Sequence, residues 1–338
     1  MTIVAEQRTY VAGRWVTGDE VVSVENPADE SHVADITVTP LPEVQRAIAE
    51  ARRSFDDGVW ADMPPVERAQ ILHAFIDHIE SERATLVPTL VAEAGQSARF
   101  AEMTQLGAGA AIARQTIDLY LSMSHEEASP VPVDDLVRGR VALSVRRHEP
   151  VGVVTAITPY NAALIMGFQK LIPALMAGNS VILRPSPLTP ISSLIFGAAA
   201  DAAGLPPGVL SVVVESGIAG AELLTSDPSV DMVSFTGSTL AGRKILAQAA
   251  PTVKRVSLEL GGKSAQIYLP DAVHRAVGGA FVAVASTAGQ ACVAATRLLV
   301  PQDKKAEVLD AVSAMYQQIK VGPPSDETAM MGPVISAA

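Results

Sequence analysis

The chain has 338 residues, of which 49% are apolar and 18% charged, and its formal net charge is −11 at pH 7. This composition excludes a disordered chain, because disorder requires few apolar residues and many charges. The acidic balance argues against a broad basic face, so we expect no nucleic-acid partner. The length suggests about two domains.

The only cysteine, Cys292, excludes an intrachain disulfide and favours a reducing, cytoplasmic location. Residues 1–10 lack the basic start and apolar run of a secretory signal, so we expect none. The uncharged run 150–169 approaches the length of a membrane span, but Gly152 and Pro159 interrupt it. We therefore expect a buried strand followed by a buried helix there, and no membrane partner.

Three helices are predicted in the first third of the chain, over residues 46–55, 65–80 and 101–123. The second has the clearest signal, because its apolar residues recur with a period of 3.6 and Pro65 suits a first helical turn. The texture then changes, since Val141, Leu143 and Val145 alternate with small or polar residues. This alternation predicts a protruding strand or hairpin at 130–148, which is either a plain edge or a subunit-pairing element.

From residue 151 onwards, short apolar runs alternate with helix-like stretches. The apolar runs are Val151–Ile157, Val181–Leu183, Val209–Val214, Met232–Phe235 and Val256–Leu260, and the helical stretches cover 162–177, 191–203, 219–224 and 240–249. This order predicts an α/β fold whose parallel sheet is covered on both faces. Ligands of such sheets bind at the carboxyl ends of the strands. We therefore expect 158–161, 184–187, 216–220 and 236–239 to line one crevice.

The segment 237–242 follows an apolar strand and opens a helix. Free N–H groups and the helix dipole at such a position bind phosphate, and Gly237 lets a ligand approach the backbone. The same residues also describe a helix that is merely capped by Ser238. The spacing departs from G-x-G-x-x-G, so the motif alone leaves both interpretations open.

Three further residues have two interpretations each. Cys292 is either an inert buried thiol or a nucleophile. Glu259, at the end of an apolar strand, is either salt-bridged to Lys263 or a general base. Asn161, in the loop after a buried strand, either caps a helix or donates a hydrogen bond to an oxyanion.

The motifs together are more specific than any one of them. They are Pro159-Tyr160-Asn161, Phe235-Thr236-Gly237-Ser238-Thr239, Leu258-Glu259-Leu260-Gly261-Gly262-Lys263 and Gly289-Gln290-Ala291-Cys292. In this order and at these distances, they resemble the aldehyde dehydrogenase superfamily. The likeness runs from Gly13-Arg14-Trp15 and Asn26-Pro27 to the last residue.

The resemblance implies a domain organisation. It predicts a Rossmann-like, parallel-sheet cofactor domain at 1–129 and 149–261, and an oligomerisation hairpin at 130–148. Residues 262–338 would form the first part of an α/β catalytic domain that is incomplete, because family members continue beyond Ala338. The full-length protein would form a homodimer or homotetramer.

The resemblance also implies a mechanism, with a small-molecule aldehyde as substrate and no metal. Cys292 would attack the aldehyde to give a thiohemiacetal, and Asn161 with the Cys292 N–H would stabilise the oxyanion. Hydride transfer would leave a thioester, and Glu259 would activate the water that hydrolyses it. Lys170 matches a lysine near the family's site and would serve a proton relay.

The implied cofactor is NAD or NADP. Its expected contacts are Thr158, Pro159, Ser186, Gly217, Gly220, Thr236, Gly237, Ser238 and Leu260. Two departures bear on the adenosine ribose, where Arg184 replaces the usual lysine and Pro187 replaces a glutamate common in NAD-preferring members. A guanidinium binds phosphate well, and the lost carboxylate no longer repels a 2′-phosphate. We therefore expect NADP to be accepted, and a preference for it is a hypothesis.

Two points stay open at this level. A chain without the C-terminal region that family members have is expected to be weakly active or inactive alone. The alternative function is a nucleotide-binding fragment or pseudoenzyme without turnover; an acyl-CoA-forming relative is disfavoured by Glu259. The side chains of Tyr160, Met166 and Phe168 either border an apolar substrate tunnel or belong to the core.

Overall fold

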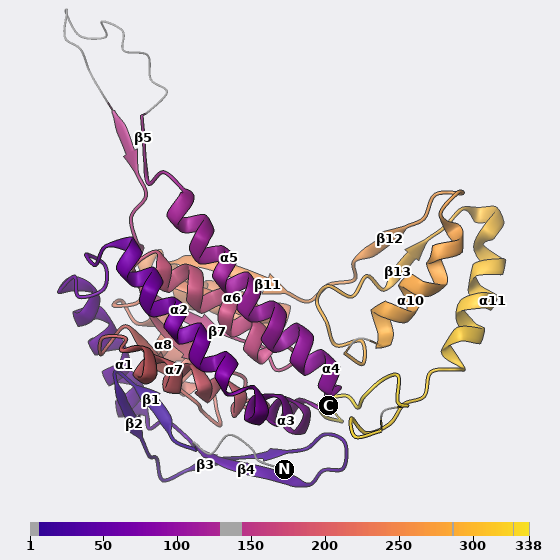
Figure 1. Cartoon of the computed structure of the whole chain (residues 1–338), viewed down its shortest axis with the longest axis horizontal. Coiled ribbons are helices and arrows are strands. Elements are labelled where there is room, and N and C mark those ends of the chain that lie inside the picture. The colour runs from indigo at the N-terminus through magenta and orange to yellow at the C-terminus, as the bar shows by residue number, and fades with distance from the viewer. Residues whose placement is uncertain (1–6, 129–143, 286, 327, 338) are drawn as a thin grey trace, which may run out of the picture.

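The computed structural model describes residues 7–128, 144–285, 287–326 and 328–337 (Figure 1). Its centre is a seven-stranded sheet in the order β11-β10-β7-β8-β9-β1-β2. The strands are β1 (Thr9–Val11), β2 (Arg14–Val16), β7 (Val153–Ile157), β8 (Ser180–Arg184), β9 (Leu210–Val212), β10 (Met232–Gly237) and β11 (Arg255–Leu260). Strands β11 to β9 run parallel, and β1 and β2 add an antiparallel edge. The predicted α/β fold with a parallel sheet is confirmed.

Helices cover both faces of this sheet, because alternate strand residues point to opposite sides. Val154 and Val181 belong to one apolar cluster, whereas Val153 and Ile182 belong to another. The first cluster involves α2 (Pro65–Ser81), α5 (Gly109–Ser122), α6 (Ala163–Met176) and α7 (Ile195–Ala203), and the opposite face is covered by α1 (Leu41–Asp56), α8 (Ala219–Ser226) and α9 (Thr239–Ala249). All five residues of β7 are buried, which explains the uninterrupted apolar runs in the sequence.

The first third contains the three predicted helices and also more. Helix α2 matches the prediction, whereas α1 begins earlier, at Leu41, with a proline in its first turn. The third helix begins as a π-helix (Ala101–Ala108) and continues as α5. Elements that the sequence did not predict are β1, β2, β3 (Val21–Glu25), β4 (His32–Thr37), α3 (Arg83–Ala94) and α4 (Ala98–Phe100). The early strands were missed because they are short, and β3 and β4 expose much of their length.

The base of a hairpin follows α5. Strand β5 (Glu126–Ala128) pairs antiparallel with β6 (Val145–Arg147), and all six residues are exposed. The predicted hairpin at 130–148 is therefore paired further upstream than expected, while residues 129–143 lie outside the described part of the chain. Its role in oligomerisation stays a prediction.

The remaining elements form a smaller unit, residues 262–320, here called the C-terminal unit; residues 7–128 and 144–261 are called the sheet body. The unit holds a parallel pair, β12 (Ala265–Ile267) and β13 (Arg297–Leu299), beside α10 (Ala276–Ala285) and α11 (Lys305–Tyr316). It stands to one side of the sheet body (Figure 1). Short 3-10 turns occur at Ser192–Leu194, Ala250–Thr252, Val273–Arg275 and Gln302–Lys304. Within the described residues, no helix combines the length and apolar character of a membrane span.

Candidate active site

A groove of about 480 Å³ opens at the carboxyl ends of the parallel strands. Strand β7 lies between β10 and β8, so the chain order reverses beside β7. Such a switch point splays the connecting loops apart and is where open α/β sheets bind ligands. Of the residues predicted from the sequence, the groove is lined by Thr158, Pro159, Asn161, Arg184, Ser186, Thr236, Gly237, Ser238, Glu259, Leu260 and Cys292.

Two buried hydroxyl groups in this groove fit a polar ligand. Thr158 and Thr236 are 2% and 7% exposed, and neither hydroxyl oxygen has a hydrogen-bond partner among the described residues. They follow or end neighbouring strands, β7 and β10, on either side of the switch point. A buried hydroxyl without a partner is unfavourable, and a dinucleotide bound along the groove offers hydroxyl and phosphate oxygens to it.

The start of α9 supplies a second feature of a phosphate site. The Ser238 hydroxyl accepts a hydrogen bond from the Ala241 N–H at 3.2 Å, so this serine caps the helix. A Cβ atom at Gly237 would lie 2.5 Å from the Phe235 ring, so a larger residue would displace that ring. Both sequence interpretations of this motif are therefore compatible, because a capped helix start still presents its dipole to an anion. These residues fit a nicotinamide dinucleotide.

Three residues predicted to contact the cofactor lie outside the groove. Gly217 and Gly220 line a neighbouring cavity, together with Glu215. Pro187 lines a third cavity, near residues 23–27 and 331–337. The sequence grouped them with the groove because all follow the ends of strands β8 and β9, whereas only Arg184 and Ser186 of these segments line the groove in the structure.

The thiol of Cys292 is exposed in a loop of the C-terminal unit that reaches the groove. The loop turns at Ala288 and Gly289, whose φ angles are +51° and +73°. A left-handed φ costs glycine little, so Gly289 suits this turn, whereas Ala288 adopts a conformation that residues with a Cβ rarely take. The interpretation of Cys292 as an inert buried thiol is excluded, since the side chain is accessible.

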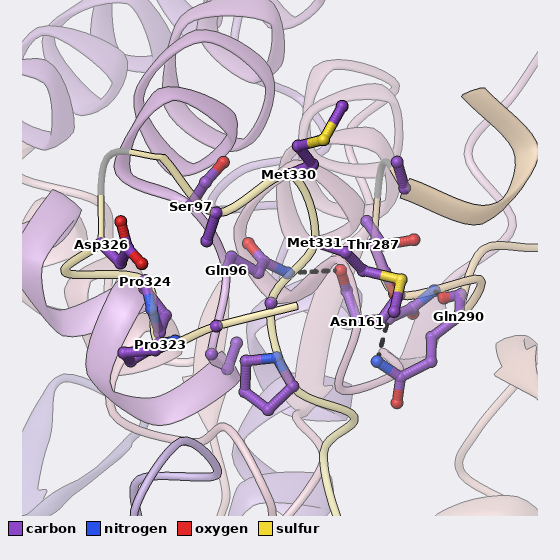
Figure 2. A pocket seen from close by; sticks show the side chains of 18 of the residues that line it. Gln96, Ser97, Asn161, Thr287, Gln290, Pro323, Pro324, Asp326, Met330 and Met331 are labelled. Carbon is purple, nitrogen blue, oxygen red and sulfur yellow. Dashed lines mark hydrogen bonds between the residues drawn. The ribbon is translucent and has the colours of Figure 1, made fainter. Parts of the chain in front are cut away.

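An amide network ties the cysteine loop to the sheet body. The Asn161 side-chain amide donates to the Gln290 carbonyl, and the Asn161 carbonyl accepts from the Gln96 amide at 2.8 Å (Figure 2). Gln105, fully buried, donates to the Gln96 side-chain oxygen at 3.0 Å. The amide of Asn161 has two N–H groups, so one is left for an oxyanion beside Cys292. Asn161 thus lies at the contact between the two parts of the protein.

The cavity behind this network is small, about 110 Å³, and is lined by residues of the sheet body, of the C-terminal unit and of the segment 322–333 (Figure 2). Gln290 is central, because its side-chain oxygen accepts from the Ile335 N–H at 3.0 Å and its nitrogen donates to the Thr287 carbonyl at 3.1 Å. Sequence reasoning did not assign Gln290, Gln96 or Gln105 a role. The only signal in the sequence was at Gln290, a polar amide between small residues in Gly289-Gln290-Ala291-Cys292.

Glu259 and Lys170 occupy different depths at the same site. Glu259 is exposed near the end of the edge strand β11, and no ion pair joins it to Lys263, although both are described residues. The salt-bridge interpretation is therefore wrong. Lys170, in α6, is 8% exposed and donates to the Ser234 hydroxyl at 2.9 Å. Burial lowers the pKa of Lys170 to about 8, and the charge of Glu259 opposes that shift.

The three residues that could border a substrate tunnel lie in two different environments. Tyr160 and Met166 line the groove, whereas Phe168 is fully buried in the core of the sheet body. There it packs edge-on against Phe196, with ring centroids 5.5 Å apart. The tunnel interpretation of Phe168 is wrong, because residues on one helix that are two positions apart face different directions.

The sequence profile of the aldehyde dehydrogenase family matches residues 15–338. The chain belongs to the aldehyde dehydrogenase family. It is 34% identical to phenylacetaldehyde dehydrogenase of Pseudomonas fluorescens, covering 96% of this chain and 65% of that protein.

Two solved structures resemble the chain closely. An aldehyde dehydrogenase from Bacillus cereus in complex with NAD+ has a TM-score of 0.91 and 31% identity, over 99% of this chain and 67% of that one. An NADP-dependent enzyme of E. coli has a TM-score of 0.89 and 30% identity, over 98% and 67%. The chain thus spans about two thirds of the length of these proteins.

Proposed function

We propose that the chain oxidises an aldehyde to a carboxylic acid with NAD+ or NADP+, using Cys292 as the nucleophile. The observation that carries this proposal is one groove that holds an exposed thiol, a carboxylate and two unpartnered buried hydroxyls at the switch point of a parallel sheet. Family membership supports it, and the two similar structures, one in complex with NAD+ and one NADP-dependent, support either cofactor.

The first step is addition of the Cys292 sulfur to the carbonyl carbon. The carbonyl double bond opens to an alkoxide, which the free N–H of the Asn161 side chain and the Cys292 N–H stabilise. A thiolate is the attacking form, so the thiol proton must leave, and the nearby Glu259 carboxylate is the group we assign to accept it. The product is a thiohemiacetal held in the groove.

A dinucleotide held in the groove would supply the hydride acceptor, and loss of hydride from the thiohemiacetal carbon would leave a thioester on Cys292. Glu259 would first release the thiol proton to solvent, to which it is exposed, and the restored carboxylate would then remove a proton from water, whose oxygen attacks the thioester carbon. The carbon–sulfur bond breaks, which releases the acid and restores the thiolate. Lys170 is buried close enough to Glu259 to feel its charge. With a pKa of about 8, Lys170 is suited to hold or give up a proton close to neutral pH. The exposed position of Glu259 gives it access to solvent for this exchange.

The substrate end of the groove contains Tyr160 and Met166, which favours an apolar aldehyde. The hairpin base β5–β6 is exposed on every residue, and we propose that it contributes to a homodimer or homotetramer. Light scattering of the purified protein measures that state directly. The cytoplasmic location stays a prediction.

The test of the catalytic proposal uses the single thiol. The protein is incubated with a panel of aldehydes and either cofactor, and formation of the reduced cofactor is followed. Cys292→Ala is expected to lower turnover at least about 10³-fold, as nucleophile removal does elsewhere. Val293→Ala, at an 83% exposed neighbour, is the matched control and should change turnover less than about twofold.

The same experiment separates the alternative function. Cys292 is the only cysteine, so alkylation reports on it alone. Tight binding of a reduced dinucleotide and normal alkylation without turnover would favour a nucleotide-binding fragment or pseudoenzyme. Weak turnover of the 338-residue chain is our expectation, because Cys292 and its neighbour Val293 are exposed and water competes with substrate there.

A further inference from the structure

The guanidinium of Arg184, which lines the cofactor groove, is already paired. Its Nε atom donates to the Glu215 carboxylate at 2.9 Å, and one Nη atom donates to the Gly217 carbonyl at 3.1 Å. The two side chains are only 13% and 9% exposed. Solvent screens such a pair poorly, so the carboxylate strongly offsets the charge of the guanidinium.

Glu215 is fixed from its other side by helix α8. Its two carboxylate oxygens accept hydrogen bonds from the N–H groups of Gly220 at 2.8 Å and Ala221 at 3.0 Å. A Cβ atom at Gly220 would lie 2.6 Å from the carboxylate, so this close approach requires glycine. The start of α8 is thus occupied by a carboxylate of the chain itself.

The charge at this position bears on the choice between the two cofactors. A free guanidinium near the adenosine ribose favours a 2′-phosphate, whereas a carboxylate there favours a 2′-hydroxyl. Pro187 stands in the loop after β8, where NAD-preferring members of the family often have a glutamate, so one carboxylate is missing there. In the structure, Glu215, three residues after the end of β9, brings a different carboxylate to Arg184. The two residues are 31 positions apart, and no local pattern signals the pairing.

We propose that Glu215 is a specificity-determining residue, whose carboxylate cancels the charge of Arg184 and so weakens selection for the 2′-phosphorylated cofactor. Glu215 does not line the groove and acts through Arg184. This inference rests on the proposed function, because it assumes that the groove binds a nicotinamide dinucleotide. It sharpens the expectation from Arg184 and Pro187: NADP is accepted, but its advantage over NAD is held down by the ion pair.

Direct binding of NADH and NADPH, followed by fluorescence titration, tests the inference without turnover. In Glu215→Gln, the ratio of the two dissociation constants is expected to shift about tenfold in favour of NADPH, the effect of one charged hydrogen-bonding partner. Glu222→Gln removes the same charge from an exposed position on α8 and should leave the ratio unchanged. An unchanged ratio in Glu215→Gln, or a shift toward NADH, would overturn the inference.

A double variant keeps the test decisive if Glu215→Gln alone folds poorly. Arg184→Gln with Glu215→Gln replaces a neutral ion pair by a neutral amide pair, which is milder than removing one partner. We expect the ratio of its dissociation constants for NADPH and NADH to stay within about threefold of the ratio in the unmodified protein. A threefold change corresponds to roughly 0.7 kcal/mol. A loss of tenfold or more would show that Arg184 acts as a free cation. Binding of neither dinucleotide to the unmodified protein would instead contradict the proposed function itself.

Discussion

The sheet body and the C-terminal unit differ in how firmly their strands are held. Strand β7 is buried along its whole length, whereas β12 and β13 expose alternate residues, including Ile267 at 72% and Leu299 at 51%. The C-terminal unit has only a small core around Val273, Ala276 and Val308. The groove is therefore built on a deep core, while Cys292 is carried by a thinly packed unit. The proposed chemistry depends on both parts, so we expect it to be sensitive to the contact that joins them.

The largest expected effect is a loss of turnover in a variant whose two parts both stay folded. Glu259→Gln should lower steady-state turnover by about 10² to 10⁴-fold, the usual contribution of a general base. Because Glu259 is exposed, unfolding stability should change by less than about 0.5 kcal/mol. Rapid-mixing kinetics should still show some reduced cofactor formed in the first turnover if hydrolysis is the step that slows most.

The matched control for Glu259→Gln is Glu222→Gln, which removes an exposed carboxylate away from the groove. An unchanged steady-state rate in Glu259→Gln would remove this carboxylate from the mechanism.

The next prediction compares the loss of unfolding free energy for one apolar side chain in the sheet body and one in the C-terminal unit. Phe168→Ala deletes a fully buried ring that packs on Phe196, so the free energy of unfolding should fall by about 3–5 kcal/mol. Ile267→Ala removes a similarly apolar but 72% exposed side chain from β12 and should cost about 0.5 kcal/mol or less. Urea unfolding of both variants gives the two values. Equal losses would mean that Ile267 is covered in solution, for example by a second copy of the chain.

The contrast also explains what could be predicted from sequence. The parallel strands were predictable because a strand buried on both faces is an apolar run, as in Val153–Ile157. Strands β3 and β4 were missed because their residues are partly exposed and mixed in polarity. The groove residues at the ends of β7 and β10 followed from topology, whereas Glu215 and Gln290 depend on contacts between distant segments. No local pattern records such contacts.

The free energy of unfolding should depend on pH because of one buried carboxyl group in the sheet body. Glu93, in α3, is fully buried and accepts hydrogen bonds from the Ile191 and Ser192 N–H groups at 2.8 and 3.1 Å. Burial raises the pKa of Glu93 from 4.5 to about 7. The folded state then holds a proton that the unfolded state has lost, so this group's stabilisation is full below about pH 4.5 and is lost as pH rises through about 7.

The measurement for Glu93 is urea unfolding of the unmodified protein and of Glu93→Gln between those pH values. The stability difference should fall with rising pH, at most about 1.4 kcal/mol per pH unit for one proton. Parallel pH profiles in the two proteins would show that Glu93 ionises alike in the folded and unfolded states.

The smallest effect concerns the loop that carries Cys292, which the Gln290 side chain ties to residues 287 and 335. Gln290→Ala removes the side-chain bonds to Thr287 and Ile335, while the Gln290 carbonyl can still accept from Asn161. Each lost bond is worth about 1 kcal/mol, so the loop that carries Cys292 should become more mobile. We expect turnover to fall about tenfold, with little change in NADPH binding, because the groove is built on the sheet body.

Alkylation of Cys292 distinguishes this positioning role from general damage. A looser loop should change the alkylation rate of the thiol without lowering the cofactor affinity, and Gln290→Glu should restore part of the turnover because it keeps an acceptor for the Ile335 N–H. Gln318→Ala, at an exposed amide of the same chain region, is the control. If Gln290→Ala lowers dinucleotide affinity as much as turnover, the two parts of the site are not separable and the groove itself depends on the C-terminal unit.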